Sequence, residues 1–240
     1  MQNANCRLQI AALLCIVPFA FRMTIFASAA TVVALGDSTT AGTPGFMSPI
    51  EAPPNGSGDV ESQYAHWLTK THPEWRVLNR GVNGERSDEI RARFERDVIA
   101  ERKKKDGAFL VVIIAGVNDI YQGRSAEDVE RELAAMYDAA SAAGIPAVAG
   151  TIIPYNTATD DQNRRMRAVN AWIRQYAERH PGVAYCDTRA AVAMPGRPDH
   201  LVSSPDNLHP SPDGYRLMAL VLEPVIKKLV AQAGWGGQGR

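Results

Sequence analysis

A serine near the start of the chain and an aspartate–histidine pair near its end supply the groups needed for nucleophilic chemistry. Ser38 is the last residue of a Gly-Asp-Ser segment at 36–38, and Asp206 and His209 lie three positions apart. An imidazole oriented by a carboxylate can take the proton of a serine hydroxyl, which turns a weak alcohol into a nucleophile. These residues therefore predict acyl transfer, with Ser38 as nucleophile, His209 as base and Asp206 as the orienting acid.

Two other segments offer hydrogen-bond donors for the negative charge that develops on a carbonyl oxygen during acyl transfer. Gly84 can bring its backbone N–H close to a substrate because no side chain intervenes. Asn118, in the segment 116–119, has a side-chain amide that can donate to the same oxygen. We expect these two groups and the backbone N–H of Ser38 to form an oxyanion hole.

Each of these residues also has an ordinary structural explanation, because serine caps helices and aspartate forms Asx turns. The neighbouring polar residues are interpreted in that structural way: Asp37, Asn83 and Asp119 are expected to brace loops rather than to act in catalysis. Gly81 is expected to form a tight loop with a positive φ angle. The catalytic interpretation is favoured because all the parts of one reaction occur together.

Apolar, strand-like runs alternate with amphipathic, helix-like runs along the chain, which predicts an α/β fold. Specifically, we expect a three-layer α/β/α sandwich around a five-stranded parallel sheet. The run 109–114 is continuously apolar, as is typical of a strand covered on both faces. The predicted strands are 31–35, 76–79, 108–115, 146–152 and 183–186, and the predicted helices are 61–71, 87–101, 126–143, 161–180 and 212–231.

The predicted sheet brings the candidate residues to one edge. Right-handed crossovers place every β-to-α loop beyond the carboxyl ends of parallel strands, where ligands bind in such sheets. Ser38 follows the first predicted strand, Gly84 the second and Asn118 the third. Tyr155 and Asn156 follow the fourth, where they either contact substrate or pack the loop.

Four segments resemble, in the same order, four blocks of the SGNH (GDSL-type) hydrolase family. The resemblance covers about residues 31–230. The segments are 36–38 (Gly-Asp-Ser), 79–84, 116–119 (Gly-Val-Asn-Asp) and 206–209 (Asp-Asn-Leu-His). The chain departs from the family in having Thr39 after the serine, where many members have leucine or isoleucine, which leaves the mechanism intact but weakens any assignment to a subfamily.

The resemblance implies a flavodoxin-like SGNH hydrolase fold and a serine esterase or lipase without metal or organic cofactor. By that similarity Ser38 is the nucleophile, His209 the base and Asp206 its acid, while Ser38, Gly84 and Asn118 form the oxyanion hole. The absence of a Gly-x-Ser-x-Gly segment around Ser38 argues against the α/β-hydrolase fold.

The first 30 residues have the features of an export signal. Arg7 gives a positive start, residues 8–21 are largely apolar, and small residues at 27–29 suit cleavage. The apolar run is too short to span a bilayer comfortably. We expect a secreted or periplasmic protein with no stable membrane insertion once the signal is removed. Arg22 is atypical after such a run, and an uncleaved N-terminal anchor is the alternative.

The organisation that follows is a signal peptide at 1–30, a hydrolase domain at 31–232 and a disordered tail at 233–240. The Pro- and Gly-rich segment 43–58 is expected to be an irregular loop beside Ser38, either shaping the substrate site or forming an ordered surface excursion. Cys186 is the one cysteine outside the predicted signal, so no intramolecular disulfide is expected there, and the residue is interpreted as a small buried hydrophobe.

Charge and histidine spacing exclude several classes of function. The 240 residues carry 26 basic and 26 acidic side chains, with no clustered basic surface of the kind that binds nucleic acid. The histidines outside the candidate site lack the spacing of zinc ligands, so no metal site is expected; they are His66, His72, His180 and His200.

The sequence therefore predicts an exported carboxylic ester hydrolase that acts on a small-molecule, polysaccharide or lipid ester through an acyl-enzyme. Alternatives within the hydrolases are a carbohydrate O-deacetylase, a lipase or a thioesterase. A different class is a non-catalytic module that binds carbohydrate or lipid in the same cleft. Such a module would lack one of the three triad residues, whereas this chain has all of them.

Overall fold

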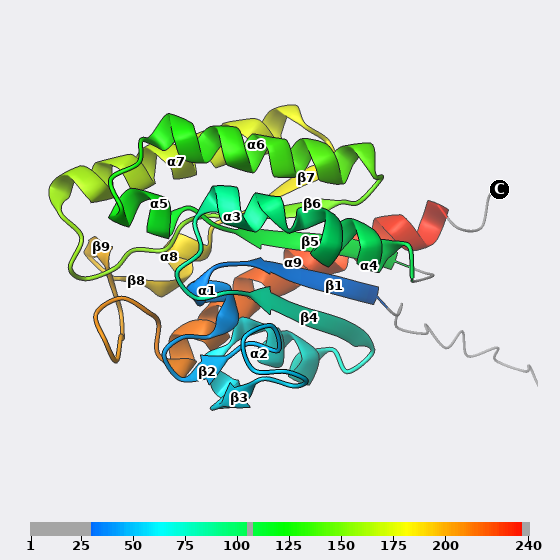
Figure 1. Cartoon of the computed structure of the whole chain (residues 1–240), viewed down its shortest axis with the longest axis horizontal. Coiled ribbons are helices and arrows are strands. Elements are labelled where there is room, and N and C mark those ends of the chain that lie inside the picture. The colour runs from blue at the N-terminus through cyan, green and yellow to red at the C-terminus, as the bar shows by residue number, and fades with distance from the viewer. Residues whose placement is uncertain (1–29, 105–107, 237–240) are drawn as a thin grey trace, which may run out of the picture.

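Five parallel strands form the central sheet of the computed structural model, which describes residues 30–104 and 108–236 (Figure 1). The strands are β1 (Ala30–Gly36), β4 (Trp75–Gly81), β5 (Ala108–Ile114), β6 (Ala147–Gly150) and β7 (Val183–Cys186). Their spatial order is β4-β1-β5-β6-β7, so the second strand of the sheet along the chain lies outside the first. This is the flavodoxin-like order, and it confirms the predicted α/β fold.

Helices and short hairpins connect these strands. The helices are α1 (Ser38–Ala41), α2 (Tyr64–Thr71), α3 (Ser87–Ala92), α4 (Ala100–Arg102), α5 (Val117–Tyr121), α6 (Ala126–Ala142), α7 (Asp160–Arg179), α8 (Thr188–Val192) and α9 (Pro212–Gly236), with a 3-10 turn η1 (Val60–Ser62) and a π turn η2 (Glu95–Ile99). Two antiparallel hairpins lie outside the sheet: β2 (Phe46–Met47) with β3 (Ser57–Gly58), and β8 (Ala193–Met194) with β9 (Arg197–Leu201).

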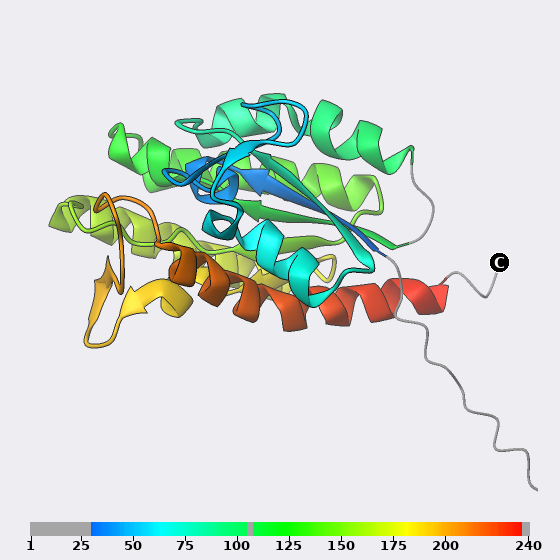
Figure 2. The same cartoon turned by 90° about the horizontal axis from the view of Figure 1, so that it is seen from below.

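The sheet separates two hydrophobic cores, because neighbouring side chains of a strand point to opposite faces. Val33 and Leu35 of β1 pack with α3, α6 and α7, whereas Val32 and Ala34 pack with α2 and α9. Figure 2 shows the two helical layers on either side of the sheet. These fully buried strands are the continuously apolar runs of the sequence.

The structure corrects two predicted helices. The segment 61–71 is divided at Gln63, whose backbone is extended, into the 3-10 turn η1 and the helix α2. The segment 87–101 is not one helix but α3, the π turn η2 and α4 in succession. Arg93, between α3 and η2, is buried and directs its guanidinium to the end of β1, where it donates to the carbonyl of Gly36 at 2.8 Å. Phe94, directly before the π turn, and Val98, within it, both lie in the core. A π turn of this kind often lies beside a functional site.

At both ends of the chain, part of the predicted organisation lies outside the described residues. Residues 1–29 lie outside the described residues, so the export signal stays a prediction. Helix α9 continues to Gly236, past the predicted end at 231, and 237–240 also lie outside the described part of the chain. Within residues 30–104 and 108–236 we find no helix with both the length and the apolar character needed to cross a membrane. Cys186 is buried, as predicted.

Candidate active site

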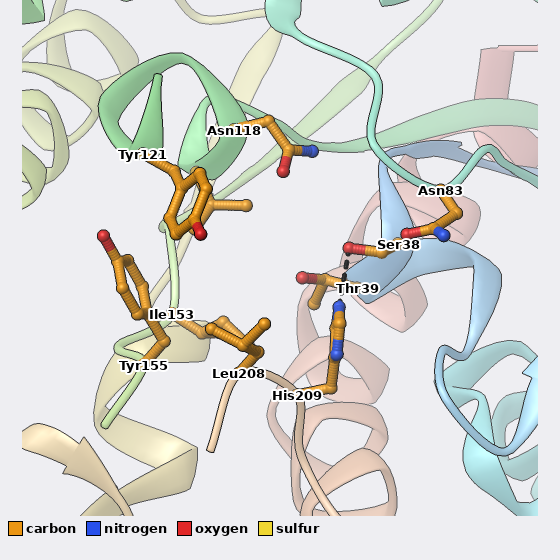
Figure 3. A pocket seen from close by; sticks show the side chains of 10 residues that line it. Ser38, Thr39, Asn83, Asn118, Tyr121, Ile153, Tyr155, Leu208 and His209 are labelled. Atoms are coloured by element: carbon orange, nitrogen blue, oxygen red, sulfur yellow. Dashed lines mark hydrogen bonds between the residues drawn. The ribbon is translucent and has the colours of Figure 1, made fainter. Parts of the chain in front are cut away.

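Ser38 lies where β1 ends, as the first residue of the short helix α1. The preceding Asp37 caps that helix, since its Oδ1 accepts the backbone N–H of Thr39 at 2.9 Å. This cap holds the backbone at the start of α1 and so orients the side chain of Ser38. The Oγ of Ser38 is 2.9 Å from Nε2 of His209, although 171 positions separate the two residues (Figure 3).

The carboxylate of Asp206 holds the other side of the imidazole. Its Oδ2 is 2.7 Å from Nδ1 of His209, while Oδ1 accepts the backbone N–H groups of Leu208 at 2.9 Å and His209 at 2.8 Å. Partial burial acts to raise the pKa of Asp206, but the hydrogen bonds from His209 and Leu208 outweigh it and the pKa lies below its ordinary value. An ionised carboxylate therefore orients the ring.

A residue in the left-handed backbone conformation lies in the turn between Asp206 and His209. Asn207 has a φ of 65°, a conformation that asparagine tolerates better than most residues. Its carbonyl accepts the backbone N–H of Asn156 at 2.8 Å, and the side chain of Asn156 accepts the N–H of Leu201 at 2.8 Å. Asn156 therefore braces the loop that carries Asp206 and His209. Of the two predicted roles, substrate contact and loop packing, these bonds favour loop packing.

The loops that carry the three predicted oxyanion donors follow β1, β4 and β5 at the same edge of the sheet. Ser38 and Asn118 line the cavity described below, whereas Gly84 is not among its lining residues. No partner for the backbone N–H of Ser38 or of Gly84 is found among the described residues. Asn118, at the start of α5, donates one amide hydrogen to the carbonyl of Glu85 at 2.8 Å, which leaves the second for another acceptor. Gly84 has a φ of 80°, a conformation that glycine adopts without cost. The arrangement can stabilise a developing oxyanion.

The prediction for Gly81 was wrong. This residue is the last of strand β4 and has no positive φ angle. A Cβ atom there would lie 2.0 Å from the backbone nitrogen of Ala41. Glycine is needed because β4 and α1 approach each other closely, which sequence reasoning cannot distinguish from a turn.

Two of the three residues expected to brace loops do so with their side chains. Asp37 caps α1, and burial raises its pKa to about 7 against the lowering effect of the bonds from Thr39. Asp119 accepts both the backbone N–H and the hydroxyl of Ser87 at 2.8 Å, and burial raises its pKa as well. The side chain of Asn83 instead lies at the candidate site, and its backbone is what braces the turn (Figure 3).

Arg93 is a buried residue of the site that sequence reasoning missed. Besides its bond to the carbonyl of Gly36, it donates to Glu85 at 2.6 Å and to Asp97 at 2.7 Å. It thereby joins the segment before Ser38 to the turn that carries Gly84. No motif or spacing in the sequence signals this role, because an arginine in an amphipathic run is typical of an exposed helix face.

A small cavity of about 180 Å³ opens beside Ser38 and His209. Ser38, Thr39, Asn83, Asn118 and His209 line its polar side, and its apolar wall is formed by Val117, Tyr121, Ile153, Tyr155 and Leu208 (Figure 3). Tyr121, which is 58% exposed, and Leu208, which is 38% exposed, lie at the rim, whereas Tyr155 is buried. The sequence predicts that Tyr155 either contacts substrate or packs the loop, and its place in the cavity wall is compatible with the first role, whereas no motif in the sequence points to Tyr121 or Leu208.

In the part of the chain that the structure describes, we find no group of three or more His, Cys, Asp or Glu side chains arranged to hold a metal ion.

Comparison with known proteins shows the family to which the chain belongs. The model of the family described as GDSL-like lipase/acylhydrolase matches residues 34–217. The chain belongs to that GDSL-like lipase/acylhydrolase family. The match contains all four segments from which the resemblance was inferred. No curated protein matches the chain in a sequence comparison.

Solved structures of GDSL proteins share the fold. A protein assigned to the lipolytic G-D-S-L family from Desulfitobacterium hafniense DCB-2 is 25% identical, with a TM-score of 0.65 over 81% of this chain and 98% of that one. A member of the same family from Veillonella parvula DSM 2008 is 20% identical, with a TM-score of 0.69 over 83% and 100%. An acetylxylan esterase from Geobacillus stearothermophilus, solved as a catalytic mutant, is 24% identical, with a TM-score of 0.61 over 81% and 93%.

Proposed function

We propose that this GDSL-family protein is an exported serine esterase that hydrolyses carboxylic esters through an acyl-enzyme on Ser38. The observation that carries the proposal is the continuous hydrogen-bonded chain from Ser38 Oγ through His209 to Asp206. The nucleophile and the orienting acid each lie within hydrogen-bond reach of the base, which is the geometry that activates a serine. Export rests on the composition of residues 1–30 alone.

In the first half of the reaction, Oγ of Ser38 attacks the ester carbonyl while Nε2 of His209 takes the hydroxyl proton. The carbonyl electron pair moves onto oxygen, where the N–H groups of Ser38 and Gly84 and the free amide hydrogen of Asn118 donate to it. When the intermediate collapses, the bond to the alcohol breaks. His209 gives its proton to the departing alkoxide, and the acyl group remains on Ser38.

The second half repeats these steps with water as the nucleophile. His209 takes a proton from water as the oxygen attacks the acyl-enzyme carbonyl, and the same three donors stabilise the second intermediate. Collapse breaks the bond to Ser38 Oγ, which regains its proton from His209, and the carboxylic acid leaves. Asp206 stays ionised and stabilises the imidazolium in both halves.

The size of the cavity favours a short acyl group or an equally small alcohol. A dry cavity of about 150 Å³ is large enough for benzene, so the cavity of about 180 Å³ beside Ser38 accepts groups of about that size. Removal of acetyl groups from carbohydrate is the second candidate, favoured by the same dimension and consistent with the esterase whose fold the chain shares. Long-chain lipase or thioesterase action is less well matched by this volume.

The test compares wild type with Ser38→Ala on p-nitrophenyl acetate and on an acetylated sugar, together with labelling by a fluorophosphonate probe. We expect the variant to lose turnover and labelling while its circular dichroism stays unchanged, because the triad acts as a unit. Ser141→Ala, on the exposed part of α6, is the matched control and should behave as wild type. Undiminished hydrolysis by Ser38→Ala would show that Ser38 is not the nucleophile and would overturn the proposal. A wild type that neither hydrolyses these esters nor reacts with the probe would favour a non-catalytic binding module.

A further inference from the structure

The Pro- and Gly-rich loop at 43–58 closes on itself as a hairpin and is hydrogen-bonded to the body of the protein at its start. Its β2 and β3 residues pair with each other, Phe46 with Gly58 and Met47 with Ser57. At its start, the hydroxyl of Tyr215, on α9, donates to the carbonyl of Thr43 at 2.8 Å. The middle of the loop is therefore held in a defined place beside the turn that carries Gly84.

Two side chains from the middle of this loop hold that turn. The hydroxyl of Ser48, which is fully buried, donates to the carbonyl of Gly81 at 2.6 Å. The carboxylate of Glu51 accepts two backbone N–H groups, that of Ser48 at 3.1 Å and that of Asn83 at 2.8 Å. The loop thus binds the last residue of β4 and the residue directly before Gly84.

The turn has two other links to the body of the protein: Val82 N–H donates to the carbonyl of Gly36 at 3.1 Å, and Arg93 donates to the side chain of Glu85 at 2.6 Å. Neither link holds Asn83, the residue directly before Gly84. Apart from the two neighbours of Gly84 in the chain, no residue has an atom within 4 Å of the position that a Cβ of Gly84 would occupy, so that side of the turn is open. Its own backbone contributes one long bond, from Glu85 N–H to the carbonyl of Val82 at 3.4 Å. After Gly84, Asn118 holds the carbonyl of Glu85 at 2.8 Å. Gly84 therefore lies between two hydrogen-bonded anchors, Glu51 on one side and Asn118 on the other.

We propose that Glu51 is a positioning residue that fixes the backbone N–H of Gly84 as an oxyanion donor. The inference rests on the proposed function, because it assigns a role within the same reaction. An oxyanion donor acts only when it lies about 2.7–3.1 Å from the charged oxygen. A displacement of about 1 Å in catalytic geometry can cost about 10²-fold in rate. The carboxylate acts through the backbone of Asn83 and does not touch the substrate.

The test measures kcat and KM for p-nitrophenyl acetate in Glu51→Ala and Glu51→Gln. We expect Glu51→Ala to lower kcat by about 10- to 100-fold and to change KM by less than about threefold, because the donor is engaged by the oxyanion more than by the ground state. Glu51→Gln should give an intermediate loss, since an amide oxygen still accepts one N–H while its NH2 group cannot accept the other. The matched control is Glu61→Ala, whose exposed carboxylate pairs with Lys70 at 3.6 Å outside the site.

The outcomes separate this inference from the proposed function. A Ser38→Ala protein that keeps its activity overturns the proposed function, whatever Glu51 does. If Ser38→Ala is inactive but Glu51→Ala keeps wild-type kcat, the role of Glu51 is overturned and the esterase proposal stands. A lower melting temperature with an unchanged kcat per folded molecule assigns Glu51 to stability alone and also overturns the inference. A parallel loss of kcat in Ser48→Ala, which frees the carbonyl of Gly81, supports it.

Discussion

The side-chain amide of Asn118 donates to the backbone carbonyl of Glu85 at 2.8 Å. The bond joins the start of α5, after the third strand of the sheet along the chain, to the turn that carries Gly84 after the second. One amide hydrogen holds the turn and the other remains for a substrate oxygen. Two of the three proposed oxyanion donors are therefore coupled: a change at Asn118 removes one donor and releases the support of another.

Replacing Asn118 should lower kcat strongly. We expect Asn118→Ala to reduce kcat by about 10²- to 10³-fold, the range for loss of one oxyanion donor, with a smaller change in KM. Asn118→Asp should lose at least as much, because an ionised carboxylate cannot donate and repels the developing charge. Steady-state kinetics with p-nitrophenyl acetate measure both. Gln175→Ala, on the exposed face of α7, is the control, and an Asn118→Ala kcat within threefold of wild type would contradict the assignment.

Replacing Asp206 tests the orientation of the imidazole. Asp206→Asn keeps an oxygen for the backbone N–H groups of Leu208 and His209, so the turn should fold. Its amide cannot accept the Nδ1–H of His209, and the ring then holds its proton at the wrong nitrogen. We expect kcat to fall by about 10⁴-fold, as in a serine protease triad with the same change. A loss smaller than tenfold would show that His209 is oriented without the carboxylate.

The positions of the proposed catalytic groups were predictable because the topology leaves them little freedom. Parallel strands joined by right-handed crossovers bring Ser38, Gly84 and Asn118 to one edge of the sheet. The pairing of Asp206 with His209 follows from a spacing of three residues in a turn. Each of these signals is local in the sequence or follows from the order of the strands, and both kinds of information are visible without coordinates.

The supporting residues could not be predicted, because their roles depend on side chains that reach across the packed fold. Arg93 lies 57 positions from the carbonyl of Gly36 that it holds, and Glu51 lies 32 positions from Asn83. Gly81 was assigned to the wrong conformation for a related reason: close approach of β4 and α1 is a property of packing, not of local sequence. No sequence pattern distinguishes Tyr121 from other aromatic residues, and only the fold shows that it lies at the cavity rim.

Tyr121 should limit the size of the group that the cavity accepts. Its ring lies at the rim and meets the ring of Tyr155 edge to face at a centroid distance of 6.0 Å. Tyr121→Ala removes that wall and should raise kcat/KM for octanoyl relative to acetyl p-nitrophenyl ester by about tenfold, since a methylene in an apolar pocket changes specificity by at least about that factor. Tyr121→Phe keeps the wall and should retain the wild-type ratio. If Tyr121→Ala leaves the ratio of kcat/KM for the octanoyl and acetyl esters unchanged, the acyl chain does not contact Tyr121.

Asp37 should make the stability of the protein depend on pH in a definite direction. Burial raises the pKa of its carboxyl to about 7 in the folded state, above the ordinary value of 3.8. The folded protein therefore binds more protons than the unfolded chain between these values. The stabilisation of the fold that comes from the protonated form of Asp37 is fully present below about pH 4 and is lost as the pH rises through about 7. Ionised Asp37 disfavours the folded state, whereas Asp37→Asn keeps an oxygen for the N–H of Thr39 and does not titrate.

Urea unfolding of wild type and Asp37→Asn at pH 5, 6, 7 and 8 measures this effect. The free energy of unfolding of the variant should rise relative to wild type by about 2–3 kcal/mol between pH 5 and pH 8, which corresponds to about two pKa units at 1.36 kcal/mol each. Groups other than Asp37 titrate in both proteins and cancel in the difference. Asp213→Asn, an exposed carboxylate on α9, controls for the change of charge. A difference between wild type and Asp37→Asn that stays constant from pH 5 to pH 8 would mean that Asp37 is ionised throughout.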